Sequence, residues 1–169
     1  MPIFSGLIEL RNVMAEDIND ILEVYLQCED FLALGLHPKS SPAMVTKDIE
    51  DVYKEGGVFK SIYIGDKLIG VASYVIKGFA GKLSDACIYL LMIVPSFRKK
   101  GIGARIVEMI EKQILADAKI TTIMAGVQVN NPRALKFWRN NGYRVTSGPE
   151  QMLDGTVVFH LCKDRKITT

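Results

Sequence analysis

Apolar positions recur along this chain with two different periods. Between residues 15 and 31 they follow the three- and four-residue spacing of a helix with one buried face, and acidic residues occupy the first turn, where the helix dipole favours them. The same helical spacing returns over residues 101–116. Two amphipathic helices are therefore expected, with further helices over 42–55 and over 132–140, where Pro132 opens the segment and Asn141-Gly142 ends it.

Runs rich in β-branched and aromatic residues predict the strands. They cover residues 7–11, 58–64, 67–76, 85–94, 120–129, 143–146 and 157–162. Gly65-Asp66 separates two of them as a tight hairpin turn. The run from Ala86 to Val94 is almost continuously apolar, which indicates a strand buried on both faces.

The order of these elements predicts the class of fold. Strands and helices interleave along the chain, which is typical of an α/β protein with a mixed sheet and helices on both faces. Neither repeats nor linker-like stretches interrupt the pattern, and 169 residues is the usual size of one domain. We expect a single domain over residues 1–169.

Composition narrows the classes of partner and compartment. Twenty-one basic and nineteen acidic residues leave a formal charge of +2, too small to hold nucleic acid by bulk electrostatics. Cys28, Cys87 and Cys162 are odd in number and far apart, and only two histidines accompany them, which argues against a disulfide framework or a metal site and fits a reducing cytoplasm. The N-terminus does not resemble a signal peptide, and the longest apolar run is far shorter than the ~20 residues that span a bilayer.

The strongest chemical feature is the turn Arg98-Lys99-Lys100-Gly101-Ile102-Gly103-Ala104, between an apolar strand and a long helix. A helix start presents unpaired backbone N–H groups, and glycines allow a phosphate to approach them. A P-loop is excluded because Ala104-Arg105 follow Gly103, and a dinucleotide fingerprint is excluded because Ile106 takes its third small position. Taken alone, the turn is also compatible with a solvated basic chain reversal, in which the glycines serve only the turn.

Two segments together resemble one family. Arg98-x-x-Gly101-x-Gly103 after an apolar strand is similar to the acetyl-CoA pyrophosphate loop of the GNAT superfamily of N-acetyltransferases. About thirty residues later, Asn131-Pro132-Arg133-Ala134-Leu135-Lys136-Phe137-Trp138-Arg139-Asn140-Asn141-Gly142-Tyr143 resembles that family's second segment. With the early strand and helix, the resemblance covers nearly the whole chain. It implies a GNAT-type fold, a mixed central sheet with splayed strands, and acetyl-CoA as co-substrate.

The resemblance also implies which residues bind acetyl-CoA. The strand backbone would contact the pantetheine arm, the turn would hold the pyrophosphate, and the second segment would supply an asparagine, a small residue and an aromatic residue beside the cofactor. These positions are Met92, Ile93 and Val94; Arg98, Lys99, Lys100, Gly101, Ile102, Gly103 and Ala104; and Asn131, Ala134 and Trp138.

The chain departs from the family pattern at the catalytic positions. Trp138 stands where a tyrosine often protonates the leaving thiolate, and an indole N–H has no useful acidity for that step. Tyr89 stands at the position of a frequent glutamate, and Asp85, Cys87 and Tyr89 alternate onto one strand face. Asp85 is the candidate base for the acceptor amine, acting directly or through water, and water ordered by Tyr89 on the same face is the alternative. Asp85 as a solvated strand-entry residue and Trp138 as a core aromatic remain the structural alternatives.

Three further side chains are weighed for chemistry. Cys87 lacks a nearby histidine that would activate it, so packing explains it better than nucleophilic catalysis. His37 lies in an expected loop, where it is a possible substrate contact or a surface histidine, and His160 is expected to be a sheet residue.

The resulting expectation is an enzyme that transfers an acetyl group from acetyl-CoA to a primary amine by direct attack. The alternative is a non-catalytic acetyl-CoA-binding sensor or assembly module of the same fold. A nucleic-acid binder using Lys99, Lys100 and Arg105 is disfavoured by the small net charge. The acceptor is expected to be a small molecule or a peptide, selected by residues 27–41 and the last strands, and the protein a monomer or homodimer without a metal.

Overall fold

The computed structural model describes residues 6–35 and 39–167, and His37 lies outside them. The chain forms two compact units, each made of two segments: residues 1–74 with 90–106, and residues 75–89 with 107–169. No helix in the described part of the chain is long and apolar enough to cross a membrane. The expectation of a single domain stays a prediction.

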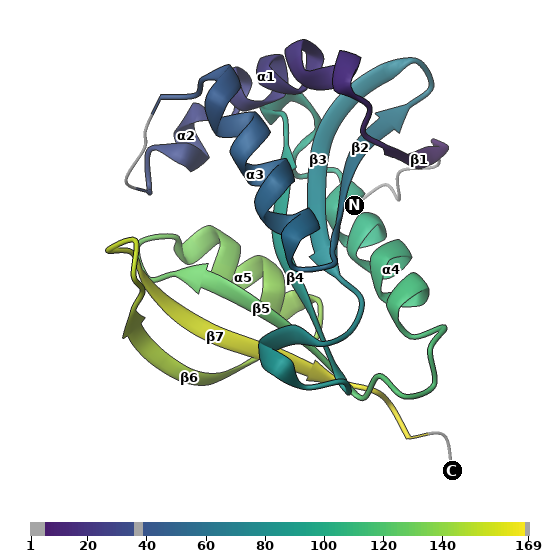
Figure 1. Cartoon of the computed structure of the whole chain (residues 1–169), viewed down its shortest axis with the longest axis vertical. Helices are drawn as coiled ribbons and strands as arrows, with labels where there is room; N and C mark the ends of the chain where they lie inside the picture. Colours follow the sequence, from purple (N-terminus) through teal and green to yellow (C-terminus); the bar gives the residue numbers. More distant parts are fainter. Residues whose placement is uncertain (1–5, 36–38, 168–169) are drawn as a thin grey trace. The chain divides into compact units, whose positions relative to one another are not determined.

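The helices and strands occur in the predicted order (Figure 1). They are β1 Ile8–Asn12, α1 Ile18–Gln27, α2 Glu29–Leu32, α3 Pro42–Lys54, β2 Val58–Ile64, β3 Lys67–Val75, β4 Asp85–Ile93, α4 Ile102–Ile114, β5 Thr122–Gln128, α5 Pro132–Asn140, β6 Arg144–Gln151 and β7 Val157–Asp164. β2 and α5 begin and end where the sequence predicts, and most other ends lie within two residues. The main differences are β6, which is longer than predicted, and the first helix, which is divided.

Seven strands form one mixed sheet in the order β1-β2-β3-β4-β5-β7-β6. β1, β2 and β3 pair antiparallel, β4 and β5 pair parallel, and β7 pairs antiparallel with both β5 and β6. This arrangement, with helices on both faces, confirms the predicted α/β class (Figure 1).

In the first unit, α1 packs against α3. Ile21, Val24 and Tyr25 are buried on α1, and the Tyr25 hydroxyl donates a 2.7 Å hydrogen bond to Asp48 on α3. The helix predicted to continue to Phe31 instead ends at Gln27. The next residue, Cys28, leaves helical geometry, although its N–H still bonds the carbonyls of Val24 and Tyr25. A short α2 follows in a new direction.

The prediction that β4 is buried on both faces is wrong for its second half. Residues 86–88 are buried, whereas Tyr89 is 39% exposed and residues 90, 91 and 93 are partly exposed. The β4–β5 register runs only from Asp85↔Thr122 to Ile88↔Ala125. The strand is apolar from Ala86 onward, so its composition does not reveal that the residues after Ile88 are less buried than residues 86–88.

In the second unit, a partly buried ion pair joins α4 to β7. The Lys163 ammonium donates to the Glu111 carboxylate at 2.9 Å and to the Asn141 carbonyl at 2.9 Å. Tyr143 donates its hydroxyl to the same carboxylate at 3.0 Å. These bonds hold the end of α5 and the start of β6 in place.

Candidate functional site

The turn between β4 and α4 has a strained backbone. Lys99 adopts φ 60° and Gly101 φ 77°, so two of three consecutive residues are left-handed. Lys99 is not a glycine, and a side chain in that conformation costs roughly 1–2 kcal/mol. A Cβ added at Gly101 would meet no atom within 4 Å, so the space beside this residue is open. The turn therefore leads into the first amides of α4 with room for an anion.

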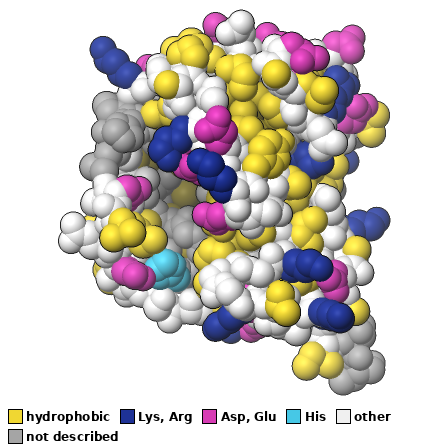
Figure 2. All heavy atoms as spheres, in the orientation of Figure 1, with side chains coloured by type: hydrophobic (Ala, Val, Ile, Leu, Met, Phe, Trp, Pro, Cys, Tyr) yellow, Lys and Arg dark blue, Asp and Glu magenta, His cyan; other side chains and the backbone are white. Residues whose placement is uncertain are grey.

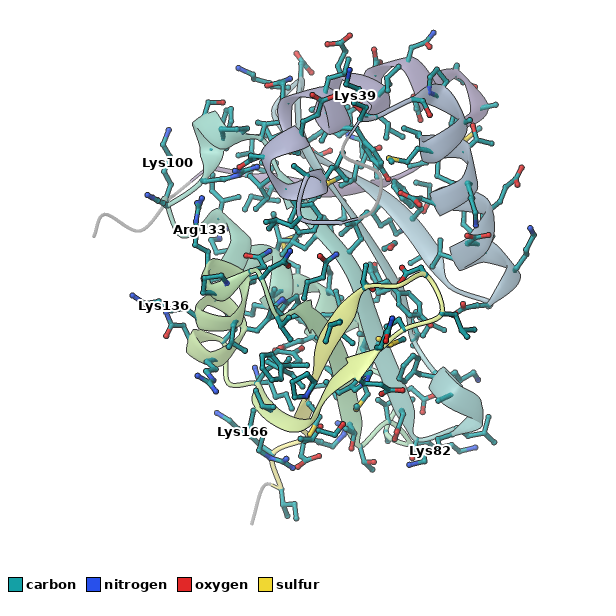
Figure 3. All side chains as sticks on the ribbon, turned by 90° about the vertical axis from the view of Figure 1, so that its left-hand side faces the viewer. Lys39, Lys82, Lys100, Arg133, Lys136 and Lys166 are labelled. Carbon is teal, nitrogen blue, oxygen red and sulfur yellow. The ribbon has the colours of Figure 1, made fainter. Side chains whose placement is uncertain are left out.

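Two lysines lie over one aromatic ring beside this turn. Lys67 Nζ is 5.1 Å and Lys100 Nζ 5.4 Å from the centroid of Phe97, distances at which the ring stabilises an ammonium group. Lys100 points outward from the protein (Figure 3). Lys67 was not among the predicted site residues, because it starts β3 and no local motif connects it to the turn.

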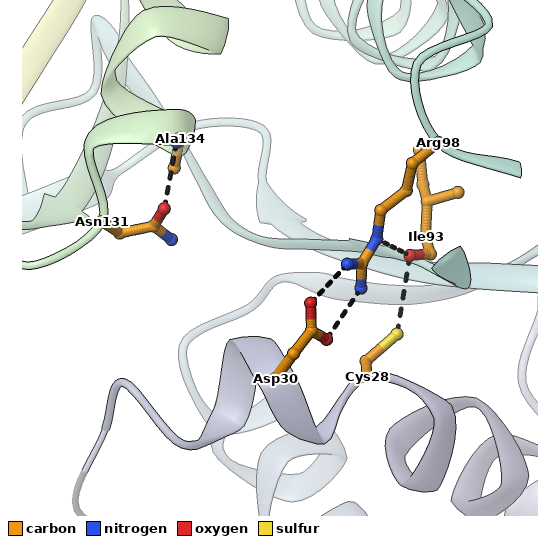
Figure 4. A network of polar contacts seen from close by, with 6 residues as sticks. All are labelled: Cys28, Asp30, Ile93, Arg98, Asn131 and Ala134. Carbon is orange, nitrogen blue, oxygen red and sulfur yellow. Dashed lines mark hydrogen bonds and ion pairs between the residues drawn. The ribbon is translucent and has the colours of Figure 1, made fainter. Parts of the chain in front are cut away.

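Arg98 is held by protein groups rather than projecting into solvent. Its guanidinium forms a two-pronged ion pair with Asp30 at 2.6 and 3.1 Å, and its Nε donates to the Ile93 carbonyl at 2.7 Å (Figure 4). The hydrogen bonds to Asp30 raise the pKa of the guanidinium further. We interpret Arg98 as a residue that positions the turn, so that binding of an anion falls to the backbone amides and the lysines.

Cys28 completes this network. Burial raises the pKa of the thiol, and the neutral thiol lies 3.6 Å from the Ile93 carbonyl oxygen as a weak donor (Figure 4). The carbonyl at the end of β4 is thus held by Cys28 from the break after α1 and by Arg98 from the turn. The break after α1 thus places Cys28 at this carbonyl and Asp30 at the Arg98 guanidinium.

The end of β4 also lies very close to β3. The Val94 N–H donates to the Ile69 carbonyl at 2.9 Å, and a Cβ on Gly70 would lie 2.2 Å from the Met92 oxygen. Since backbone groups alternate along a strand, the N–H of Ile93 faces away from β3. Among the strand positions predicted to pair with pantetheine, Ile93 therefore has its N–H on the edge opposite β3, whereas the N–H of Val94 is already bonded.

In the second unit, Asn131 caps α5. Its side-chain oxygen accepts the Ala134 N–H at 3.0 Å (Figure 4), and Arg133 and Lys136 point outward from the helix (Figure 3). Trp138 is 7% exposed and packs edge-to-face against Phe137 and Tyr143. These contacts support its interpretation as a core aromatic.

The predicted catalytic residues share one face of β4 but lie far apart along it. Asp85 and Cys87 pair in register with Thr122 and Met124 on β5, so alternation places Tyr89 on the same face. Asp85 accepts a 2.9 Å hydrogen bond from the Ser84 hydroxyl, and Cys87 is 4% exposed. Four residues at roughly 3.3 Å each separate Asp85 from Tyr89 by about 13 Å. A catalytic role for Asp85 stays a prediction.

The sequence and the fold were both compared with known proteins. The model of the Acetyltransferase (GNAT) family matches residues 18–143. No curated protein gives a significant match. An acetyltransferase from Thermus thermophilus aligns with a TM-score of 0.80 and 17% identity, over 98% of this chain and 100% of that one.

Two other solved structures were determined with coenzyme A. The spermidine N-acetyltransferase from Vibrio cholerae, in complex with CoA and spermine, aligns with a TM-score of 0.72 and 14% identity over 93% of this chain and 95% of its own. The aminoglycoside acetyltransferase AAC(6')-Ib, in complex with coenzyme A and kanamycin, aligns with a TM-score of 0.75 and 16% identity, over 94% of this chain and 95% of its own. At these identities the likeness concerns the fold.

Proposed function

The chain belongs to the acetyltransferase (GNAT) family, and from this premise we propose that it transfers an acetyl group from acetyl-CoA to a primary amine by direct attack on the thioester. The observation that carries the proposal is the turn after β4, where strained Lys99 and left-handed Gly101 lead into the first amides of α4. Strain of this kind persists where a ligand-binding conformation is needed.

The residues present fit acetyl-CoA. The amides from Lys100 to Ala104 would hold the pyrophosphate, because the open space at Gly101 admits it and the ammonium groups on Phe97 add positive charge. The pantetheine arm would add to β4 in the manner of a further strand, using the edge that the Ile93 N–H faces. A backbone N–H on that edge would polarise the thioester carbonyl.

An amine is the acceptor that the family and the related structures favour. Relatives of this fold were solved with spermine and with kanamycin, both of which are amines. We propose a small-molecule or peptide amine for this protein. An amine must lose a proton before it attacks, because an alkylammonium has no lone pair and its ordinary pKa is near 10.4.

Gly101→Ala tests the cofactor site, with Gly65→Ala as a matched control. Both glycines have positive φ, 77° and 59°, and both have open space where the Cβ would go. The backbone strain added is therefore comparable, but only Gly101 adjoins the proposed pyrophosphate site. Calorimetry should show acetyl-CoA binding weakened about tenfold or more in Gly101→Ala, about 1.4 kcal/mol, and unchanged in Gly65→Ala.

Equal affinities in folded Gly101→Ala and wild-type protein would remove the turn as the cofactor site. Release of free thiol from acetyl-CoA with a panel of amines tests the transfer itself. Tight binding without turnover on any amine would favour the alternative, a non-catalytic acetyl-CoA-binding module. The buried Trp138 in place of a frequent tyrosine is consistent with that alternative.

A further inference from the structure

An open position on the second unit's sheet lies between an aromatic ring and a histidine–glutamate pair. Gly126 on β5 is directly opposite His160 on β7, and residues opposite one another share a face of the sheet. The β4–β5 pairing ends at Ile88↔Ala125, and Tyr89 and Gly126 are the next residues of the two strands, on this same face. Gly126 is exposed, and a Cβ there would meet nothing within 4 Å.

The histidine is paired with a carboxylate. His160 Nε2 lies 2.6 Å from Glu150 Oε2, with side chains 26% and 61% exposed. In the space-filling view the histidine colour reaches the surface next to an acidic side chain (Figure 2). A carboxylate only accepts hydrogen bonds, so the imidazole hydrogen must sit on Nε2. The lone pair is then on Nδ1, where it can accept a proton.

We infer that this position is the binding site of the acceptor amine, with His160 as the base that deprotonates it and Glu150 as the residue that orients and charges the imidazole. The inference rests on the proposed function. Glycine at 126 leaves room for an aminoalkyl chain beside the Tyr89 ring, and the Glu150 carboxylate attracts an ammonium group to the histidine. The sequence predicts His160 only as a sheet residue, because its partner Glu150 lies ten residues away across a bulged hairpin.

In the proposed step the ammonium nitrogen loses two protons and gains the acetyl group. One proton of the ammonium group goes to His160 Nδ1, giving an imidazolium that the Glu150 carboxylate stabilises. The freed lone pair on nitrogen forms the bond to the acetyl carbon, and the carbon–sulfur bond breaks with its electron pair going to sulfur. The thiolate takes the second proton that nitrogen loses, and the imidazolium returns its proton to solvent. Acetyl-CoA is the only co-reactant.

Few other charged groups face His160 among the described residues. Glu150 on β6 is its partner, β5 contributes no titratable side chain at the opposite position, and the nearest ion pair on the same face is Arg144–Asp164, beyond Cys162. Ser147 pairs with His160 on β6, and the other residues on this face are Tyr89, Met124, Gln128, Val158 and Cys162. Asp85 lies on the same face at the far end of β4, where it acts electrostatically on Cys162. Burial raises the pKa of the Cys162 thiol, which keeps it neutral. Glu150 is therefore the charged group in direct contact with His160 on this face.

The test compares His160→Gln, Glu150→Gln and Asp164→Asn with the wild type. A glutamine at 160 can still donate to Glu150, but it does not accept a proton. Asp164→Asn is the matched control, because it breaks an exposed ion pair on the same face of β7, with side chains 60% and 55% exposed. The probes are spermine, kanamycin and a short peptide with a free N-terminus, each with saturating acetyl-CoA from pH 5.5 to 10.

We expect His160→Gln to lower kcat/KM for the amine by roughly 10²-fold or more at pH 7, with acetyl-CoA affinity unchanged. The deficit should close as pH approaches 10, since the amine then loses its proton unaided. Glu150→Gln should show a smaller loss of the same kind, and Asp164→Asn none. Superimposable pH profiles for His160→Gln and the wild type would overturn the assignment.

A second measurement keeps the two proposals distinguishable. The chain has two histidines, so the ring signal of His160 in an NMR spectrum is identified by its absence from His160→Gln. If the wild type acetylates no probe, the proposed transfer fails for these amines, while a saturable shift of the His160 signal with one of them supports the amine site. No turnover and no shift with any probe would overturn the site as well.

Discussion

At the scale of single residues, Arg98 is held by other protein groups at the turn proposed to bind the cofactor, and we propose that it positions this turn. Its guanidinium pairs with Asp30, which follows the break in the first helix, and its Nε donates to the carbonyl of Ile93 at the end of β4. Arginine presents these donors in a fixed plane, which lysine cannot reproduce. The strained turn at Lys99 starts directly after this anchored residue.

Arg98→Lys tests this positioning role. The variant keeps the positive charge but loses the two-pronged ion pair and the bond to the Ile93 carbonyl, so the turn should hold its conformation less well. We expect acetyl-CoA affinity to fall about tenfold, or 1.4 kcal/mol, in a folded protein. Arg11→Lys is the control, since it alters another arginine of the same unit that pairs with Glu9. Equal losses in both variants, or none in Arg98→Lys, would contradict the role.

The residues of the site differ in how far the sequence could predict them. Gly101 and the lysines of the turn could be predicted from the sequence, because they form a local motif at the end of a strand. The left-handed Lys99 was not, because its side chain has no preference for that conformation and only the surrounding structure imposes it. His160 with Glu150 was missed for another reason: the pairing depends on the register shift between Ser147 and Glu150, which periodicity does not reveal.

At the scale of helices and strands, Tyr25 and Asp48 join α1 to α3 through a buried polar contact. The hydroxyl donates to the carboxylate at 2.7 Å, and Tyr25 is fully buried. Burial raises the pKa of the Asp48 carboxyl, although the hydrogen bond from Tyr25 opposes the rise. The folded protein thus favours the protonated carboxyl more than the unfolded chain does.

This contact predicts a pH-dependent effect of Asp48→Asn. A group with a raised pKa in the folded state contributes stability that is present below its unfolded pKa, near 3.9, and is lost as pH rises through the folded value. Asparagine still accepts from Tyr25 but carries no charge. The free energy of unfolding of Asp48→Asn, relative to the wild type, should therefore rise from pH 4 to pH 7. A difference that is flat or falls over this range, measured by urea unfolding, would contradict the shift.

The strand and helix ends show where pattern reading succeeds. The bounds of β2 and α5 match the prediction at both ends. The turn at Gly65 marks the end of β2, Pro132 marks the start of α5, and Gly142 follows its end. β6 was predicted too short, since seven of its eight residues are exposed and it contains Gly148-Pro149, so neither apolar alternation nor propensity marks it. Only the ladder with β7 makes that segment a strand.

At the scale of the whole molecule, charges of both signs are mixed over the surface seen in Figure 2. The formal charge of +2 arises from a near balance of 21 basic and 19 acidic residues, and the face in view carries both signs. In the proposed function, attraction of the anionic cofactor is local to the turn after β4, and attraction of the cationic acceptor is local to Glu150. The two proposed sites carry opposite charge, as the two substrates require.

The division of the chain predicts how it unfolds. One boundary between the two units falls inside β4, between Tyr89 and Leu90, and another inside α4, between Ile106 and Val107. Neither unit can unfold without losing half of a strand and part of a helix that continue into the other. We therefore expect a single calorimetric transition whose measured and van't Hoff enthalpies agree.

Binding of acetyl-CoA provides a second test of whether the two units unfold together. At a hundredfold excess over its dissociation constant, a ligand that binds only the folded state stabilises it by about 2.7 kcal/mol. Because the proposed pyrophosphate site lies in the first unit, a cooperative molecule would pass this stabilisation to the second, and the whole transition would move to higher temperature. Two transitions, of which acetyl-CoA moves only one, would show instead that the units unfold independently and that the chain does not behave as one domain.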